Sequence, residues 1–216
     1  MNQVCKFCVM DNSDPEIRFD SNGVCCHCTE AKVKLENGWF PTEIGKQKLT
    51  ACSERIAKAC KNKEYDVIVG VSGGIDSSYL LHLVVIEMKL RPLVVHVDAG
   101  WNSEIAVKNI ENLVRKLDLD LFTYVVNWEE IRDLQLSFLK ASVANQDIPQ
   151  DHVFFAKLYE FALNNKIKYV ITGSNLTSES ILPSSWGYTA NDIAQIKGIH
   201  KKYGTVKLKT YPTMSY

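Results

Sequence analysis

Hydrophobic residues from residue 65 onward fall into two kinds of run. Four short, nearly continuous apolar runs have the length and β-branched content of buried strands: Val67–Val71, Leu93–Val97, Phe122–Val126 and Tyr169–Ile171. Segments with apolar residues at helical spacing lie between them, at 77–90, 103–118, 128–142 and 152–165. This alternation predicts an α/β fold, a doubly wound parallel sheet covered by helices on both faces.

The ends of the chain have different patterns. Residues 1–38 contain many turn signals and few apolar residues. Residues 40–62 have apolar positions at helical spacing, and Pro41 fits the first turn of a helix. After residue 189 the pattern is weaker, and we expect a helix at 190–203 and a strand at 205–210.

Composition narrows the classes of function. The 216 residues include 25 basic and 25 acidic side chains, so the chain has no excess positive charge for nucleic acid or for an anionic membrane surface. No apolar run reaches the roughly 18 residues of a membrane span, and the first residues lack the apolar core of a signal peptide. We therefore expect a soluble, cytoplasmic protein that binds neither nucleic acid nor membrane. Its seven cysteines are then expected to stay reduced.

Four cysteines form two C-x-x-C pairs separated by 16 residues: Cys5 with Cys8, and Cys25 with Cys28. This spacing is typical of a zinc ribbon, in which each pair supplies two thiolates to one tetrahedral ion. Cys26 and His27 lie inside the second pair, and we favour Cys25 and Cys28 as ligands because they preserve the two-residue gap. Two pairs of buried thiols without metal are the alternative. The sequence predicts a structural Zn²⁺ that stabilises a segment with few apolar residues.

A glycine-containing turn, Ser72–Ser77 (SGGIDS), follows the first predicted strand. Ligands of doubly wound sheets bind beyond the carboxyl ends of the strands, where glycines and helix N-termini accommodate anions. The hydroxyls of Ser72, Ser77 and Ser78 add hydrogen-bond donors, and Asp76 favours a bridging Mg²⁺. An ordinary loop whose serine and aspartate cap the next helix is the alternative.

This string lacks the lysine of a Walker loop and resembles the SGGxDS loop of the N-type ATP pyrophosphatases, the PP-loop superfamily. The resemblance covers the chain from about residue 65 and implies an adenine nucleotide alpha hydrolase-like fold. Such enzymes cleave ATP between its α and β phosphates, adenylylate a carbonyl oxygen and displace AMP with a nitrogen or sulfur nucleophile. It implies that ATP lies against Ser72, Gly73, Gly74, Asp76 and Ser77.

A second stretch strengthens this resemblance. Residues 173–179 (GSNLTSE) follow the last predicted strand and resemble the G-[TS]-x-x-x-x-E stretch of the NAD synthetases. By that resemblance Gly173 contacts the nucleotide, and Asp76 and Glu179 together hold Mg²⁺. Asp76, Glu179 and Ser72 are then the catalytic residues. The alternative for Glu179 is a solvated residue on a short helix.

The whole chain resembles the N-acetyl sugar amidotransferases of surface-polysaccharide biosynthesis. The residues that carry the resemblance are the cysteine pairs, VSGGIDSSYL, VHVDAGWNSE and TGSNLTSESILP. It implies that the acetamido group of a nucleotide-activated sugar becomes an acetamidino group, for a lipopolysaccharide O-antigen or another surface glycan. We expect a zinc ribbon at 1–38, a linking helix at 39–64 and an ATP pyrophosphatase domain at 65–216. Members of the family continue beyond the equivalent of residue 216, so we expect a shortened C-terminus.

The source of nitrogen can also be addressed from the cysteines. A glutaminase requires a nucleophilic cysteine, and position 2 is Asn2, so removal of Met1 exposes none. No strand-to-helix turn carries a cysteine either. We therefore expect free ammonia to serve in vitro and a separate glutaminase to supply it in the cell. By family resemblance, that partner is similar to the glutaminase and cyclase pair of histidine biosynthesis and delivers ammonia through a protected path.

Two other functions remain as alternatives. Some tRNA-thiolating enzymes combine a zinc ribbon with the same ATP loop, but they need reactive cysteines or an iron–sulfur cluster in the catalytic domain. The remaining cysteines here, Cys52 and Cys60, precede the sheet at a spacing typical of buried apolar residues. The third possibility is a nucleotide-binding protein without activity.

Further polar residues are candidates for ligand contacts. Asp98, Trp101 and Asn102 follow the second strand, and we expect them to line the adenosine side, with the backbone near Val97 recognising adenine; Asp98 is equally compatible with a plain turn.

Asp147, Asp151 and His152 precede a predicted helix. We favour Asp151 as its N-cap, with contact to the sugar or to ammonia as the alternative. We expect three lysines to lie on a solvated helix face: Lys197, Lys201 and Lys202. The alternative is that they bind the phosphates of the nucleotide sugar.

Overall fold

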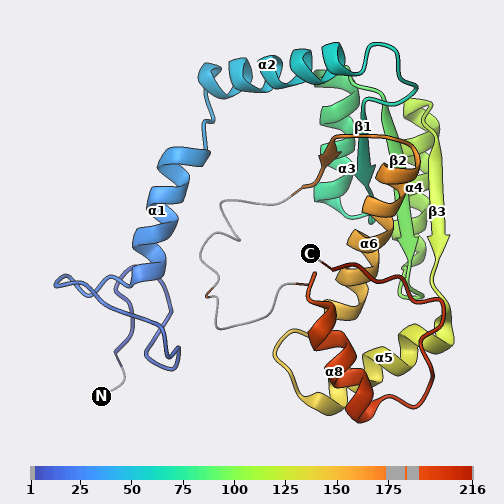
Figure 1. Cartoon of the computed structure of the whole chain (residues 1–216). Coiled ribbons are helices and arrows are strands. Elements are labelled where there is room, and N and C mark those ends of the chain that lie inside the picture. Colours follow the sequence, from blue (N-terminus) through green and yellow to red (C-terminus); the bar gives the residue numbers. More distant parts are fainter. Residues whose placement is uncertain (1–2, 174–182, 184–189, 216) are drawn as a thin grey trace. The chain divides into compact units, whose positions relative to one another are not determined.

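The computed structural model describes residues 3–173, 183 and 190–215 (Figure 1). The chain divides into two compact units. One contains the described residues up to Lys48, and the other runs from Leu49 to Gly173 and, among the described residues, resumes at 190. The boundary falls inside helix α2 (Glu43–Ala59), which confirms the helix predicted at 40–62 with shorter ends.

The first unit is built around its cysteines. Isolated antiparallel bridges join Val4 to Asp11 and Phe19 to Cys25, and the chain then enters helix α1 (Cys26–Gly38). The sequence predicted only turns over this segment. Its helical pattern is weak, because α1 buries little besides His27, Cys28 and Ala31 and is otherwise solvated.

The second unit contains a four-stranded parallel sheet, which confirms the predicted fold class. Its strands lie in the order β3-β2-β1-β4, and each corresponds to one of the four predicted apolar runs. Val69 on β1 pairs with Val94 on β2 and with Ile171 on β4. The strands are β1 (Val67–Gly70), β2 (Pro92–Asp98), β3 (Leu121–Val125) and β4 (Val170–Ile171).

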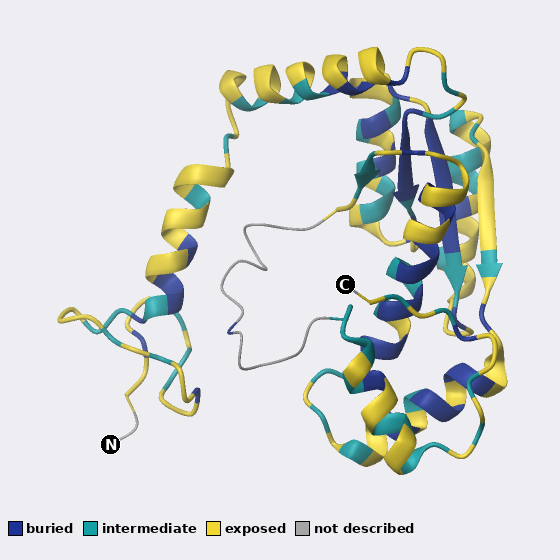
Figure 2. Cartoon of the chain, viewed as in Figure 1, coloured by how far each residue is buried: buried dark blue, intermediate teal, exposed yellow. Residues whose placement is uncertain are grey.

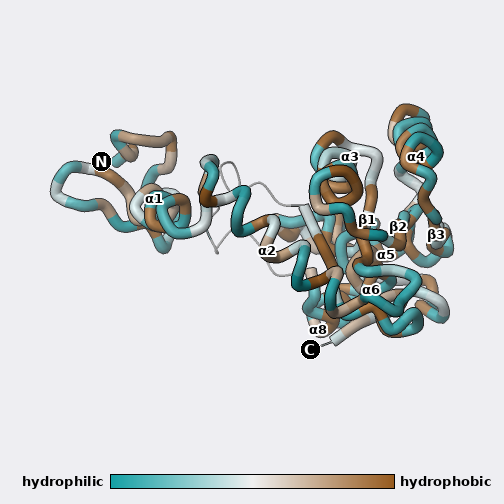
Figure 3. The backbone as a smooth tube through the Cα atoms, turned by 90° about the horizontal axis from the view of Figure 1, so that it is seen from above, coloured by the Kyte–Doolittle hydropathy of each residue, from teal (hydrophilic) through white to brown (hydrophobic). Residues whose placement is uncertain are grey.

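Helices cover both faces of this sheet. Side chains of a strand alternate between faces, so Val67 and Val69 pack with one layer of helices and Ile68 packs with the other. The first layer contains α3 (Ile75–His82), the π-helical turn η1 (Leu83–Glu87) and α4 (Glu104–Leu117). The second contains α6 (Ile148–Asn164). Figure 2 shows β1 and β2 almost wholly buried, and Figure 3 shows the alternation of hydrophilic and hydrophobic residues along the amphipathic α4.

A smaller core lies beyond the carboxyl ends of the strands, where α5 (Trp128–Ala141) and α8 (Ile193–Tyr203) pack together. The predicted strand at 205–210 is wrong, because this tail forms no sheet ladder. Its N–H groups donate to carboxylates instead. Thr205 N–H lies 2.9 Å from Asp133, and Tyr211 N–H lies 2.7 Å from Glu130.

Helix α6 begins four residues before the predicted 152. Its N-cap is therefore Asp147, and Asp151 lies inside the first turn, so the N-cap predicted for Asp151 is wrong. Pro149, in that first turn, can begin a helix because its missing N–H would have no intrahelical partner there. Among the described residues, no helix is both long and apolar enough to cross a membrane.

Candidate functional site

The loop after β1 is held against α4 by a glycine with a positive φ angle. Gly73 has φ +77°, and a Cβ placed on it would lie 2.3 Å from the carbonyl oxygen of Ala106. Only glycine fits this combination of backbone angle and close approach. The Asn109 side-chain amide donates to the Gly73 carbonyl at 3.0 Å, which fixes the loop from the same helix.

Two serine hydroxyls close the loop. The Oγ atoms of Ser72 and Ser77 lie 3.1 Å apart, and the Ser77 Oγ accepts the Ser72 N–H at 3.2 Å. Helix α3 starts after Gly74, which has no side chain to cap it. The first-turn N–H groups of α3 thus meet no capping side chain, and such N–H groups favour an anion such as phosphate.

A cavity of about 480 Å³ opens beside this loop in the second unit. Four of the residues predicted to bind the nucleotide line it: Ser72, Ser77, Val97 and Gly173. Gly73 and Gly74 shape the loop backbone. Asp76, in the first turn of α3, is exposed, and the Asp76 carbonyl oxygen lies 3.8 Å from the point where a Gly173 Cβ would be. The ends of β1 and β4 therefore meet at the cavity.

Oxygen ligands for Mg²⁺ are present at this edge of the sheet. The Asp76 carboxylate and the hydroxyls of Ser72 and Ser77 are ligands of the kind that Mg²⁺ prefers. The second predicted ligand, Glu179, lies outside the described residues. Asp76 is not among the described residues that line the cavity, and its pairing with Glu179 around Mg²⁺ stays a prediction.

The residues after β2 form a second wall. Trp101 and Asn102 line the cavity, as the sequence predicted for the adenosine side. Asp98 does not line it, and its Oδ1 accepts the N–H of Gly100 at 2.8 Å. The structure thus gives Asp98 the hydrogen bond of a turn residue, which was its alternative role.

His96 also lines the cavity, and the sequence analysis missed it. It is buried in β2, where its Nδ1 lies 2.9 Å from the carbonyl oxygen of Val71 and its Nε2 lies 3.0 Å from the side-chain amide of Asn102. Nδ1–H therefore donates to the loop backbone, and Nε2 accepts from Asn102. The sequence did contain one sign of His96: it is a polar residue within an otherwise apolar strand. No motif, however, indicates its role.

Helix α6 supplies the third wall. Asp151, Phe154 and Phe155 share one face of the helix at spacings of three and four residues, and all three line the cavity together with Gln150. The Phe154 ring packs against Gly70, where an added Cβ would lie 2.2 Å from the ring. Burial, reinforced by the charge of Asp147, raises the pKa of Asp151 above its ordinary value.

His152 and the three lysines that the sequence also suggested as ligand contacts do not line the cavity. His152 Nδ1 lies 2.6 Å from the carbonyl oxygen of Ala190, and its Nε2 accepts the Met214 N–H at 3.1 Å. Burial lowers the pKa of His152, which favours its neutral form, and these two hydrogen bonds attach the tail to α6. The three candidate lysines are exposed on α8 and do not line the cavity: Lys197, Lys201 and Lys202.

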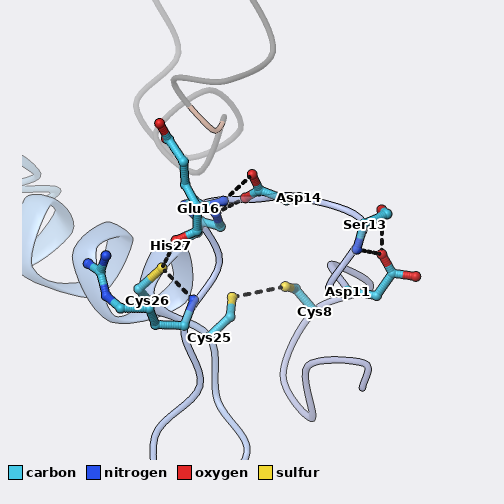
Figure 4. A network of polar contacts seen from close by, with 9 residues as sticks. Cys8, Asp11, Ser13, Asp14, Glu16, Cys25, Cys26 and His27 are labelled. Atoms are coloured by element: carbon cyan, nitrogen blue, oxygen red, sulfur yellow. Dashed lines mark hydrogen bonds and ion pairs between the residues drawn. The ribbon is translucent and has the colours of Figure 1, made fainter. Parts of the chain in front are cut away.

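The first unit brings four thiols together, and Figure 4 shows two of them, Cys8 and Cys25. The sulfur atoms of Cys5, Cys8, Cys25 and Cys28 all lie within 4.8 Å of one another. The Cys5–Cys28 and Cys8–Cys25 separations are 4.0 and 3.7 Å. A tetrahedral ion with Zn–S bonds of about 2.3 Å requires about 3.8 Å between sulfurs. The geometry fits a Zn²⁺ ion held by the four predicted ligands.

Cys26 and His27, which lie inside the second cysteine pair, have other partners. The Cys26 sulfur accepts the Arg18 N–H at 3.4 Å, and His27 Nε2 lies 2.6 Å from Asp14 Oδ2 (Figure 4). Burial acts to raise the pKa of three thiols in the cluster, and it leaves the pKa of Cys25 and of Cys28 above the ordinary value. For Cys5, N–H donors from Cys8, Phe7 and Cys25 outweigh burial and lower the pKa to about 6. A thiolate is the form that binds metal.

Comparison with known proteins places the second unit in a family. Residues 49–211 match the family model described as NAD synthase. The NH3-dependent NAD synthetase from Campylobacter jejuni, solved with nitrate, is 19% identical, with 73% of this chain and 72% of that chain covered and a TM-score of 0.47. No curated protein sequence matches the chain.

Two further solved structures are similar. NMN synthetase from Francisella tularensis is 19% identical over 63% of this chain and 56% of its own, with a TM-score of 0.46. Glutamine-dependent NAD+ synthetase from Acinetobacter baumannii, solved with ADP, is 16% identical over 63% and 26%, with a TM-score of 0.48. The chain thus spans about half of the former and a quarter of the latter. Since the family model matches well over half of its residues, this chain belongs to the NAD synthase family, within the PP-loop ATP pyrophosphatases.

Proposed function

We propose that the chain is an ATP-dependent amidotransferase that converts the acetamido group of a nucleotide-activated sugar into an acetamidino group. Membership of the NAD synthase family supports the use of ATP. One observation carries the choice of acceptor: the four-cysteine unit lies outside residues 49–211, yet it belongs to the pattern that resembles the N-acetyl sugar amidotransferases. The product serves a surface glycan such as a lipopolysaccharide O-antigen.

The chemistry explains why ATP is required. An amide oxygen is a poor leaving group, so the acetamido oxygen first attacks the α-phosphorus of ATP and pyrophosphate departs. The adenylylated group loses its N–H proton to become an imidate. Ammonia then adds to the imidate carbon, and the C–O bond breaks with its electrons leaving on the oxygen of AMP. The acetamido oxygen therefore ends on AMP, and the sugar gains one nitrogen.

The chain's own groups have distinct parts in this sequence. The loop N–H groups with the hydroxyls of Ser72 and Ser77 bind the phosphates, and Gly73, fixed by Asn109, keeps the loop rigid. Asp76, with Glu179, would hold the Mg²⁺ that neutralises charge on pyrophosphate. Among the described residues that line the cavity there is no lysine or arginine to neutralise the phosphates of ATP, so a cation such as Mg²⁺ is needed for this purpose.

A separate glutaminase is part of the proposal. A glutaminase site needs a cysteine nucleophile, and no cysteine is among the described residues that line the cavity. Four cysteines form the cluster, Cys26 accepts a backbone N–H, and Cys60 is buried. Cys52 lies in α2 beside Arg55. The chain therefore uses ammonia that a partner releases from glutamine.

An isotope experiment tests the function. The purified chain is supplied with ATP, Mg²⁺, ammonium and nucleotide sugars whose acetamido oxygen is ¹⁸O, and AMP is analysed by mass spectrometry. We expect ¹⁸O in AMP and a sugar product with one added nitrogen, both absent in Asp76→Asn. Parallel reactions contain tRNA and the carboxylate precursors of NAD and NMN. AMP formation with one of these and with no sugar would overturn the proposal.

A further inference from the structure

Asp151 is the one charged side chain among the described residues that line the cavity. The wall is otherwise made of backbone, hydroxyl, amide and apolar groups, and both ring nitrogens of His96 already have partners. The Asp151 carboxylate is half-buried and has no hydrogen-bond partner in the part of the chain that the structure describes. A carboxylate in this position attracts a positively charged group that enters the cavity.

Aromatic rings accompany this carboxylate. Phe154 and Phe155 lie one helical turn further along the same face of α6, and Trp101 lines the cavity from the end of β2. Aromatic faces attract cations, so the three rings and the carboxylate favour the same kind of ligand. Because Phe154 packs on Gly70, the cavity wall formed by α6 lies close to the start of the loop Ser72–Ser77.

The charge of Asp151 does not benefit the fold. Burial and the neighbouring Asp147 raise its pKa, which means that the folded chain disfavours the ionised form. Glu130 and Asp133 provide the contrast, because several N–H donors lower the pKa of each despite burial. A carboxylate that lines a cavity and has a raised pKa and no partner for its charge is a candidate functional group.

We propose that Asp151 binds the ammonium ion that supplies the nitrogen and accepts its proton. The inference rests on the proposed function. An ammonium N–H donates to the carboxylate, and charge-assisted hydrogen bonds of this kind are strong. The proton first moves from ammonium to an Asp151 oxygen, which leaves ammonia with a free lone pair. That lone pair forms the new C–N bond at the imidate carbon, a proton of the added nitrogen passes to the imidate nitrogen, and the electrons of the breaking C–O bond leave with AMP. Asp151 then returns the proton to water.

Kinetics of an isosteric variant test this role. In Asp151→Asn we expect the KM for ammonium to rise about tenfold or more, with the KM for ATP unchanged. Hydroxylamine, a nucleophile that is largely uncharged near neutral pH, should react with the variant within about threefold of the wild-type rate, because it needs no carboxylate. Glu111→Gln, an exposed carboxylate on α4 outside the cavity, is the matched control. Wild-type ammonium saturation in Asp151→Asn would overturn the proposal.

A binding measurement separates this inference from the choice of sugar. Crystals of the full chain are soaked with thallium(I), which has the charge and approximate size of ammonium, and its position is read from anomalous scattering. We expect thallium at the Asp151 carboxylate and none there in Asp151→Asn. That result would support the site even if no sugar is a substrate. A wild-type cavity without thallium at Asp151 contradicts it.

Discussion

Gly73 and Gly74, in the loop after β1, differ in the space available for an added Cβ atom. Gly73 has φ +77°, and an added Cβ would lie 2.3 Å from the Ala106 carbonyl oxygen, which is backbone and cannot rotate away. Gly74 has φ −77°, and its nearest contact would be the Ser72 Oγ at 3.4 Å. The fold therefore requires a glycine at position 73, whereas it has room for a Cβ at position 74.

We predict that Gly73→Ala destabilises the fold by about 2 kcal/mol or more, since it adds left-handed backbone strain to a clash. Displacement of the loop should lower AMP formation about 100-fold. Gly74→Ala is the matched control and should change stability by less than about 1 kcal/mol. Urea unfolding and an assay for AMP measure both. Equal effects of the two substitutions would contradict this account of the loop.

At the scale of elements, the C-terminal tail is attached to α5 by two buried carboxylates. Glu130 accepts N–H groups of Thr210 and Tyr211, and Asp133 accepts those of Thr205 and Val206. Burial acts to raise the pKa of Glu130, but these donors outweigh it and leave the pKa below its ordinary value. The ionised form of Glu130 is thus the one that holds the tail.

We predict that Glu130→Gln lowers the free energy of unfolding by about 2 kcal/mol near neutral pH, because it replaces charged hydrogen bonds in a buried site. Glu129→Gln, exposed on the same helix, is the control and should have little effect.

The pH dependence of this contribution follows from the lowered pKa of Glu130. The stabilisation should be complete above the ordinary pKa of 4.5 and should disappear as the pH falls through the lower folded value. The difference between wild type and Glu130→Gln should shrink over that range, as measured by denaturant unfolding at a series of pH values. A difference that does not depend on pH would contradict the role of the charge.

At the scale of the whole molecule, the two units differ in what stabilises them. The second unit has large apolar cores on both faces of its sheet. In the first unit, the buried members of the described core are three cysteines, with only partly buried apolar residues around them. So small a core is marginal by itself, and an ion bound by the four thiolates would compensate for it.

We predict one Zn²⁺ per chain. Cys8→Ser should abolish it and unfold the first unit, because three thiolates leave the ion incompletely held. Cys26→Ser is the matched control and should keep the metal, since the Cys26 sulfur lies against Arg18 rather than in the cluster. Elemental analysis measures the zinc, and amide hydrogen exchange measures each unit. Loss of zinc in Cys26→Ser, or full zinc in Cys8→Ser, would show that the ligand set is wrong.

Local spacing was enough to determine part of this protein. The apolar runs predicted β1 and β2 because a strand buried on both faces needs apolar side chains at every position. The edge strands β3 and β4 are more exposed, and their β-branched and aromatic residues predicted them instead. The cysteine spacing predicted the four clustered sulfurs, since each pair needs only a short turn to bring two thiols to one ion. The position of Ser72–Ser77 after a strand predicted its place at the edge of the sheet for the same local reason.

Contacts between distant residues decided the rest. Asp151 and His96 line one cavity only because α6 and β2 converge on the loop after β1, and no periodicity within either segment records that meeting. The pattern of residues 205–210 predicted a strand, yet Glu130 and Asp133, more than 70 positions earlier, supply acceptors for N–H groups of this tail. A backbone N–H pairs with whichever acceptor folding brings within reach, and only the tertiary structure determines which one that is.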